Sequence, residues 1–282
     1  MIDNSLLWST YVYDWYQDYI PWFIYSVLRA YPQDYCRIFL REPLNPRTAE
    51  ALAVIRDVSP NFEVIDRHHP EFCGDQRCYR FIQPKENFAP YRYAIVGDID
   101  MLILPPWGNR TGQFQWHKAN AERMGVPYSN AIAKNGPGLL TSYGHFIDVE
   151  PYYEKIQPVI DAALNMPMLE MLSTPAWFAE RSRRLLYSLC DQAHGIPDSI
   201  RDVKAFLLSW PSLHLHYILH VIQNGRDPSP IMRSKKFAYE INCCLDTATA
   251  HALRSIINKG RVARVMEKTW EIFAGKVERD FT

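Results

Sequence analysis

The sequence predicts an α/β protein with a mainly parallel central sheet. Short apolar segments typical of strands alternate with amphipathic segments typical of helices through the first third of the chain. This alternation favours right-handed crossovers between parallel strands. One strand-like segment, residues 91–104, is apolar nearly throughout, which is typical of a strand buried on both faces. Apolar residues make up 48% of the 282 residues, enough for a sizeable core in one large domain or two small ones.

The elements of this first part follow from local patterns. The expected strands are residues 6–13, 36–40, 62–65 and 91–104, and the expected helices are residues 21–31 and 46–55. Pro21 suits the first turn of a helix, and Pro32 ends that helix. Asn45 is a suitable N-cap for the second helix, because its side chain can accept from a backbone N–H and Pro46 follows at the first helical position.

The rest of the chain is predicted to hold further helices and short strands. Helices are expected at residues 115–124, 151–164 and 175–194, and strands at residues 128–133 and 139–149. From about Ala248 the sequence is helical and basic, with interleaved apolar residues. We therefore place one domain at residues 1–247 and a helical extension packed on it at residues 248–282. The alternative for the extension is an amphipathic helix that contacts a membrane surface peripherally.

Two carboxylates interrupt the apolar segment YRYAIVGDIDMLIL. Asp98 and Asp100 are costly to bury as bare charges, so a cation, hydrogen bonds or water must compensate them. Residues two apart point to the same side of an extended chain, and a turn near Gly97 would let both carboxylates converge on one ion. Carboxylate oxygens suit Mg²⁺ and Mn²⁺. The alternative is a strand-end loop that carries two solvated aspartates, because so short a pattern also arises by chance.

Composition excludes several classes of function. The formal net charge is zero and the pI is near 7.1, which argues against nucleic-acid binding as the main task. No apolar segment approaches the length of a membrane span, and the first ten residues, MIDNSLLWST, show no signal peptide, so a cytoplasmic location is expected. Aromatic residues reach 13%, which fits ring stacking on sugars or bases as well as ordinary packing.

The cysteines and two neighbouring histidines raise the question of a second metal site. His68, His69, Cys73 and Cys78 are all of zinc-ligand type. Their spacing fits no common zinc pattern, so a structural zinc is disfavoured, and a Cys73–Cys78 disulfide is an equal alternative. Free thiols are the expectation for the cysteines of a cytosolic chain.

Three segments, in this order, resemble the glycosyltransferases of the GT-A fold. They are STYVYDWYQDYIPWFIYSVL, CYRFIQP and AIVGDIDMLIL, and the nearest resemblance is to glycosyltransferase family 8 and related bacterial and viral enzymes. It covers roughly residues 5–220. The resemblance implies a single Rossmann-like domain of the GT-A type. It also implies a metal-dependent enzyme that moves a sugar, with retention of configuration, from a nucleotide-diphosphate sugar to a glycan or other hydroxyl acceptor, with UDP favoured and Mn²⁺ or Mg²⁺ as cofactor.

The resemblance also implies roles for individual residues. Asp98 and Asp100 would bind the metal, and His214 is preferred over His216 as a third ligand, with His145 as the next candidate. The glycine that follows the ligand histidine in relatives is absent here. Arg80 would contact the donor near its ribose or diphosphate, with a local ion pair as an equal alternative. The remaining donor-side residues are Thr10, Tyr11, Val12, Asp14, Ile99, Ser142, Gly144 and His145, with Asp191 as an acidic sugar-binding element. The asparagine that family 8 carries beside the donor sugar is missing.

Two other functions stay open at this point. A nucleotidyltransferase that makes sugar nucleotides would usually show a Gly-rich, basic loop after its first strand, and TYVYDWYQDY is neither. A non-catalytic glycan- or nucleotide-binding protein would not need both Asp98 and Asp100. Metal-dependent hydrolysis of a donor would separate an enzyme from such a binding protein.

Overall fold

A six-stranded mixed sheet forms the centre of the protein, in the order β3-β2-β1-β4-β7-β6. The computed structural model describes residues 2–69, 76–80, 83–105, 113–130, 145–164, 212–226 and 235–274. Four neighbouring strands run parallel: β3 (Phe62–Ile65), β2 (Tyr35–Leu40), β1 (Ile2–Val12) and β4 (Tyr91–Val96). Beyond β4, the strand β7 (His145–Asp148) pairs antiparallel with β4, and β6 (Tyr128–Asn130) pairs antiparallel with β7. The prediction of an α/β fold with a mainly parallel central sheet is confirmed.

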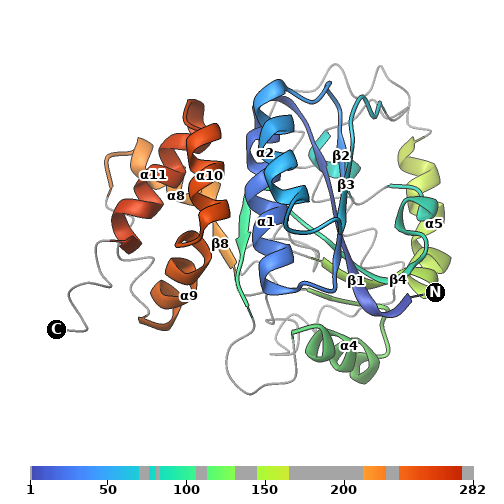
Figure 1. Cartoon of the computed structure of the whole chain (residues 1–282). Helices are drawn as coiled ribbons and strands as arrows, with labels where there is room; N and C mark the ends of the chain where they lie inside the picture. The colour runs from blue at the N-terminus through green and yellow to red at the C-terminus, as the bar shows by residue number, and fades with distance from the viewer. Residues whose placement is uncertain are drawn as a thin grey trace.

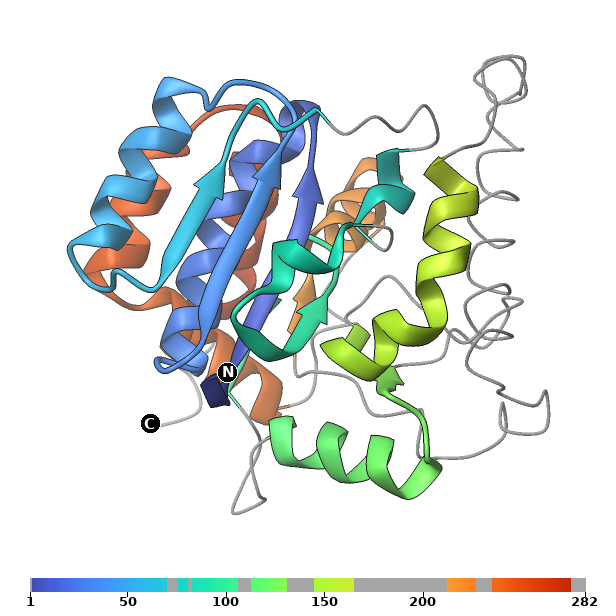
Figure 2. The ribbon, with the colours of Figure 1, turned by 90° about the vertical axis from the view of Figure 1, so that its right-hand side faces the viewer.

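Strand β1 packs against apolar clusters on both faces of the sheet, which explains why its apolar residues lie on both sides. Trp8 and Val12 face one apolar cluster, whereas Leu7 and Tyr11 face the other, and all four are buried. Successive side chains of a strand point to opposite faces, and a strand in the middle of a covered sheet is therefore buried on both. In Figure 2 the parallel strands point the same way, so their carboxyl ends meet at one edge of the sheet.

Helices cover both faces of this sheet (Figure 1). One face carries α1 (Ile20–Ala30) and α2 (Pro46–Arg56), and the other carries α5 (Val149–Leu164). The helix α4 (Gln113–Met124) contacts β6, and three short helical turns complete this part: η1 (Asp14–Tyr19), α3 (Gln76–Tyr79) and η2 (Lys85–Phe88). The expected helices of this part are confirmed within a few residues, whereas residues 175–194 lie outside the described residues.

The start of α2 confirms the predicted cap. The side chain of Asn45 accepts a hydrogen bond from the backbone N–H of Thr48 at 2.7 Å, and Pro46 occupies the first helical position. This satisfies one of the N–H groups that a helix start leaves without an intrahelical partner. The entry to α1 differs from the expectation, because the turn η1 precedes the helix and brings a group of aromatic side chains to the end of β1.

The helices of the C-terminal part pack beside α1 and α2 (Figure 1). They are α8 (Leu215–Gln223), α9 (Lys235–Leu245), α10 (Ala248–Ile256) and α11 (Gly260–Ala274). Trp270 of α11 meets Trp22 of α1 edge-on at a centroid distance of 5.7 Å. Tyr25 of α1 donates a hydrogen bond to the carbonyl of Cys244 at 2.8 Å. Helical structure after Ala248 is thus confirmed in the described part, and the boundary at residue 247 stays a prediction.

Peripheral membrane contact through these helices gains no support from the structure. The apolar residues of α11 are buried against the rest of the protein, among them Val265, Met266 and Phe273. An interfacial helix would need that face exposed to lipid. In the described part of the chain no helix combines the length and the apolar character that crossing a membrane requires.

The segment of residues 91–104 forms two strands rather than one. β4 ends at Val96, and after a turn the chain continues as β5 (Met101–Ile103). β5 leaves the central sheet and pairs antiparallel with β8 (Ser212–His214) in a separate two-stranded sheet. The expected turn near Gly97 is present, and the two acidic residues lie in it.

The cysteines and the histidine pair give no sign of a second metal site among the described residues. Cys36, Cys243 and Cys244 are free thiols. The ring of His68 lies 3.0 Å from the hydroxyl of Tyr79, so this imidazole has a local hydrogen-bond partner. The other two members of the predicted group, Cys73 and the side chain of Cys78, lie outside the described residues.

Candidate metal centre

The turn that carries the two aspartates is anchored to β1. The backbone N–H of Gly97 donates to the carbonyl of Ser9 at 3.3 Å, and the hydroxyl of Thr10 donates to the carbonyl of Gly97 at 2.7 Å. β1 pairs with β2 on one side and with β4 on the other, so the strand order reverses between β1 and β4. Ligands of open α/β sheets bind at the carboxyl ends of strands beside such a reversal.

The small sheet brings His214 to Asp100. In its register Met101 is opposite His214, and the backbone N–H of Leu215 donates to the carbonyl of Asp100 at 2.8 Å. As a result, Nε2 of His214 lies 3.1 Å from Oδ2 of Asp100. The small sheet is itself fixed to α1, because the hydroxyl of Ser26 accepts from the N–H of Ile103 at 2.9 Å.

Asp98, Asp100 and His214 form a group that could hold a metal ion. One ligand atom from each residue lies within 4.8 Å of the other two. Asp100 is only 6% exposed. Two adjacent ligands of an octahedral ion at bond lengths near 2.1 Å would lie about 3 Å apart, which the 3.1 Å between His214 and Asp100 matches. Two carboxylates and one imidazole suit Mn²⁺, and the carboxylates also suit Mg²⁺.

Arg80 adds a positive charge to this group. Its guanidinium forms an ion pair with the carboxylate of Asp98. The side chains of Arg80 and Asp98 are 9% and 15% exposed, so the pair is largely shielded from water. Arg80 directly follows α3, so this short helix delivers the guanidinium to the turn after β4. Of the two predicted possibilities the structure shows the local ion pair, and its partner, Asp98, is a predicted metal ligand, whereas the contact of Arg80 with a donor stays a prediction.

The charges of the site shift the pKa values of its neighbours. Burial lowers the pKa of His214, but the hydrogen bond and charge of Asp100, followed by the charge of Asp98, outweigh it and leave the pKa raised. Burial raises the pKa of Tyr16 to about 12, with the charge of Asp100 as the next cause. The same two causes raise the pKa of Tyr19. Tyr16 therefore lies within electrostatic reach of both Asp98 and Asp100, and Tyr19 lies within reach of Asp100.

An aromatic row beside the acidic pair was not predicted from the sequence. The rings of Trp15 and Tyr16 stack at 4.2 Å, and Tyr13 lies 5.8 Å from Tyr16 on the side of β1. The guanidinium of Arg261, from the first turn of α11, lies 4.8 Å above the ring of Trp15. The signal was present in DWYQDY directly after the first strand, but aromatic side chains also suit ordinary packing.

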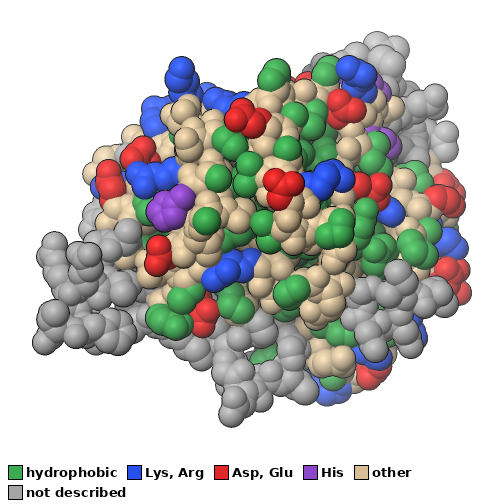
Figure 3. Space-filling model, in the orientation of Figure 1, with side chains coloured by type: hydrophobic (Ala, Val, Ile, Leu, Met, Phe, Trp, Pro, Cys, Tyr) green, Lys and Arg blue, Asp and Glu red, His purple; other side chains and the backbone are tan. Residues whose placement is uncertain are grey.

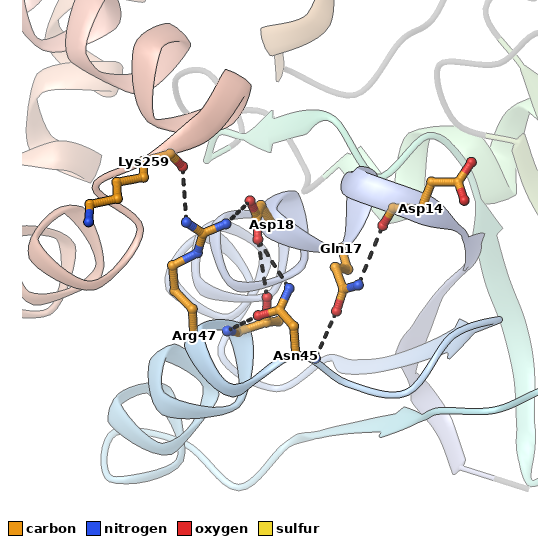
Figure 4. A network of polar contacts seen from close by, with 7 residues as sticks. Asp14, Gln17, Asp18, Asn45, Arg47 and Lys259 are labelled. Carbon is orange, nitrogen blue, oxygen red and sulfur yellow. Dashed lines mark hydrogen bonds and ion pairs between the residues drawn. The ribbon is translucent and has the colours of Figure 1, made fainter.

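A polar network ties η1 to neighbouring elements (Figure 4). The buried carboxylate of Asp18 pairs with Arg47 and accepts from the Asn45 side chain at 3.3 Å. Arg47 also donates to the carbonyl of Lys259 at 3.2 Å, just before α11. The side chain of Gln17 accepts from the N–H of Asn45 at 2.9 Å. The network thus ties η1 to the start of α2 and to the start of α11.

The predicted donor residues at the end of β1 are mostly buried. Thr10 and Val12 are each 1% exposed, and only Asp14, with a φ of 53°, is open to solvent. The ring of Tyr11 meets Tyr79 edge-on at 4.6 Å, and its hydroxyl donates to the carbonyl of His68 at 3.4 Å. The Tyr11 ring is thus packed inside the protein.

The other predicted donor residues fall into three groups. His145 lies opposite Val96 on β7 and is 1% exposed, with its ring 4.9 Å from Tyr128 and 5.4 Å from Tyr152. Ile99 is buried in the apolar cluster beneath the turn. The third group, Ser142, Gly144 and Asp191, lies outside the described residues, as does the side chain of His216, the alternative third metal ligand.

The surface charges agree with the balanced composition. On the face shown in Figure 3, basic and acidic side chains are intermixed and not gathered into a patch of one sign.

Solved structures similar to this chain include three glycosyltransferases. They are the galactosyltransferase LgtC in complex with donor and acceptor sugar analogues (TM-score 0.42, 13% identity, 59% of this chain and 69% of that one), GlyE of Streptococcus pneumoniae TIGR4 (0.43, 9%, 95% and 64%) and residues 1–349 of S. aureus TarS in complex with UDP (0.40, 9%, 99% and 93%). No protein-family model matches the sequence, and no curated protein matches it.

Proposed function

We propose that this protein is a GT-A glycosyltransferase that uses a divalent metal ion and a nucleotide-diphosphate sugar. The observation that carries the proposal is the convergence of Asp98, Asp100 and His214 at the carboxyl end of β4, beside the strand reversal. A small ionic ligand group at this place suits a diphosphate that arrives with its own metal ion. The resemblance to glycosyltransferase family 8 supports the same reaction.

The proposed metal ligands are Asp98, Asp100 and His214, with Mn²⁺ preferred over Mg²⁺ because one ligand is an imidazole. When bound, such an ion would offset the negative charge that builds on the departing diphosphate. The protein's own task is to hold these ligands in place. The β5–β8 register fixes His214 against Asp100, and Thr10 fixes the turn through Gly97.

Arg80 is the proposed contact for the donor diphosphate. Its planar guanidinium can donate two parallel hydrogen bonds to phosphate oxygens, and its low exposure strengthens such contacts. Preorganised donors of this kind stabilise charge that develops on a leaving group. Tyr13 and Tyr16 would form a wall of the same site, because Tyr13 directly follows β1 and Tyr16 lies within electrostatic reach of the acidic pair.

The finer features of the reaction rest on the family resemblance. We propose UDP as the nucleotide, a hexose or deoxyhexose as the sugar, a glycan or other hydroxyl acceptor, and retention of configuration. The donor-sugar contacts assigned to Ser142, Gly144, His145 and Asp191 stay predictions, as does the contact of Tyr11 with the base.

A panel of sugar nucleotides with Mn²⁺ tests the proposal directly. We expect release of nucleoside diphosphate from one or a few donors, dependent on Mn²⁺ and faster with a suitable acceptor. The same panel includes nucleoside triphosphates with sugar phosphates, because a nucleotidyltransferase would instead release pyrophosphate. If no donor is consumed and no nucleoside diphosphate binds with Mn²⁺ present, the proposed function is wrong.

A further inference from the structure

The carboxylate of Asp98 belongs both to an ion pair and to the candidate metal site. It forms an ion pair with Arg80, and it also belongs to the group of three residues whose ligand atoms lie within 4.8 Å of one another. The guanidinium of Arg80 and an ion in the candidate site would therefore share one carboxylate, whose side chain is 15% exposed. Arg80 keeps its charge at every relevant pH, so its effect on this carboxylate cannot be removed by deprotonation.

The charges indicate why Arg80 and a bound divalent ion would interfere with each other. A divalent ion held by Asp98 and Asp100 would lie close to the guanidinium of Arg80, because Arg80 pairs with Asp98, and like charges in a partly dry site repel more strongly than in water. Two carboxylates offset the ion alone and leave the positive charge of Arg80 unbalanced. A diphosphate brings further negative charge and phosphate oxygens that suit the fork of the guanidinium.

We propose that Arg80 couples the binding of the divalent ion to the binding of a nucleoside diphosphate. Without nucleotide, Arg80 occupies Asp98 and weakens the metal site. A bound diphosphate accepts the guanidinium, Asp98 becomes fully available, and the ion binds more tightly. Arg80 is thus a positioning residue for the metal ligand Asp98 as well as a donor contact. This inference rests on the proposed function, because it assumes that a metal ion and a nucleoside diphosphate share the site.

The coupling has a direction that a purely structural ion pair would not produce. If Arg80 only stabilises the fold, a neutral residue at this position should weaken metal binding or leave it unchanged. If Arg80 competes with the ion, the neutral residue should strengthen the binding of metal alone. By linkage, if the diphosphate tightens metal binding by some factor, the metal tightens diphosphate binding by the same factor.

Titration of Mn²⁺, followed by the electron paramagnetic resonance signal of the free ion, measures these affinities without any enzymatic turnover. The full chain is titrated alone and with saturating UDP, as wild type and as Arg80→Met. Arg92→Met serves as the matched control, because Arg92 also pairs with an aspartate, Asp148 at 3.2 Å, at the opposite end of β4. Circular dichroism checks that each variant is folded.

We expect Arg80→Met to bind Mn²⁺ alone about tenfold more tightly than the wild type, as loss of one nearby positive charge implies. UDP should lower the Kd for Mn²⁺ by some factor in the wild type. We expect that factor to be smaller by about tenfold or more in this variant, within the usual range of coupling between sites. Arg92→Met should match the wild type in both. If Arg80→Met does not fold, Arg80→Lys provides the test, because a point charge replaces the fork and the UDP effect should fall by at least about threefold.

The possible failures are distinguishable. If the wild type binds both Mn²⁺ and UDP, but Arg80→Met binds Mn²⁺ no more tightly and keeps the full effect of UDP, the coupling role is wrong and the proposed function survives. An unchanged UDP effect in Arg80→Lys likewise overturns the coupling. If the wild type binds neither Mn²⁺ nor UDP, both the coupling and the proposed function are overturned.

Discussion

Nε2 of His214 lies 3.1 Å from Oδ2 of Asp100, although 114 residues separate them in the chain. The contact exists because β8 pairs with β5 in a register that sets His214 opposite Met101. The hydrogen bond from the backbone N–H of Leu215 to the carbonyl of Asp100 links the same two segments. A late segment of the chain thereby reaches the candidate metal site at the end of the fourth strand.

Replacement of His214 by alanine should weaken the metal site. We expect the Mn²⁺ concentration for half-maximal activity to rise by roughly 10- to 100-fold, as for the loss of a group that orients or binds a metal. The preference for Mn²⁺ over Mg²⁺ should fall, because only oxygen ligands remain. The measurement is a metal titration of donor turnover with each ion.

His220→Ala is the control for this prediction, since His220 is exposed on α8 and bonds locally to Asn224. His216→Ala tests the histidine that lies two residues after His214, in the first turn of α8. His145 should have no effect on metal dependence, because its ring packs between Tyr128 and Tyr152. A large effect at His216 instead would move the third ligand by two residues and contradict the role of His214.

The buried carboxyl of Asp34 should make stability depend on pH. Burial raises its pKa from 3.8 to about 6, although hydrogen bonds from Trp8 and from the N–H of Leu6 lower it. Because the folded state holds this proton more tightly than the unfolded state, the stabilisation is full below about pH 4 and is lost as the pH rises through about 6. The loss should amount to about 3 kcal/mol.

Urea unfolding between pH 4 and pH 7 measures this effect if the wild type is compared with Asp34→Asn. As the pH rises, the unfolding free energy of the wild type should fall relative to that of Asp34→Asn, because asparagine carries no titratable proton. A difference that stays constant over this range would show that Asp34 titrates alike in the folded and unfolded states.

The network around Asp18 should contribute to stability through its hold on η1. Asp18→Ala removes the carboxylate that pairs with Arg47 and accepts from Asn45, and we expect the unfolding free energy to fall by about 1–3 kcal/mol. Glu271→Ala removes an exposed carboxylate that pairs with Lys268 on α11 and should cost less than about 0.5 kcal/mol. Equal losses in the two variants, measured by urea denaturation, would contradict this account.

Much of the fold could be predicted because the signals are local. The cap at Asn45, the proline at the start of α2 and the apolar strand segments each depend on a few neighbouring residues, and the structure places these elements within a few residues of the expectation. The alternation of these elements then implies the parallel order of the strands. The place of Asp98 at the end of the fourth strand follows from that order.

The remaining features depend on contacts between distant segments. Nothing in residues 101–103 shows that they leave the central sheet and pair with residues 212–214. The partner of Arg80 was open between a phosphate and a local acid, because sequence spacing does not decide which charge lies nearest. The row of Tyr13, Trp15 and Tyr16 was overlooked because aromatic residues are equally typical of a core.

The most direct test of the central claim is the binding of Mn²⁺ and UDP to the wild type and to Asp100→Asn, followed by calorimetry. This substitution keeps the size of the side chain but removes the charge that the imidazole of His214 contacts and that would hold the ion. We expect the wild type to bind UDP in the presence of Mn²⁺ and to lose most of that affinity in chelator. Asp100→Asn should show the weak binding with or without Mn²⁺. Binding of UDP that is equally tight in the wild type and in Asp100→Asn, or that is insensitive to chelator, would contradict the assignment of Asp98, Asp100 and His214 as a metal site for a nucleotide-diphosphate sugar.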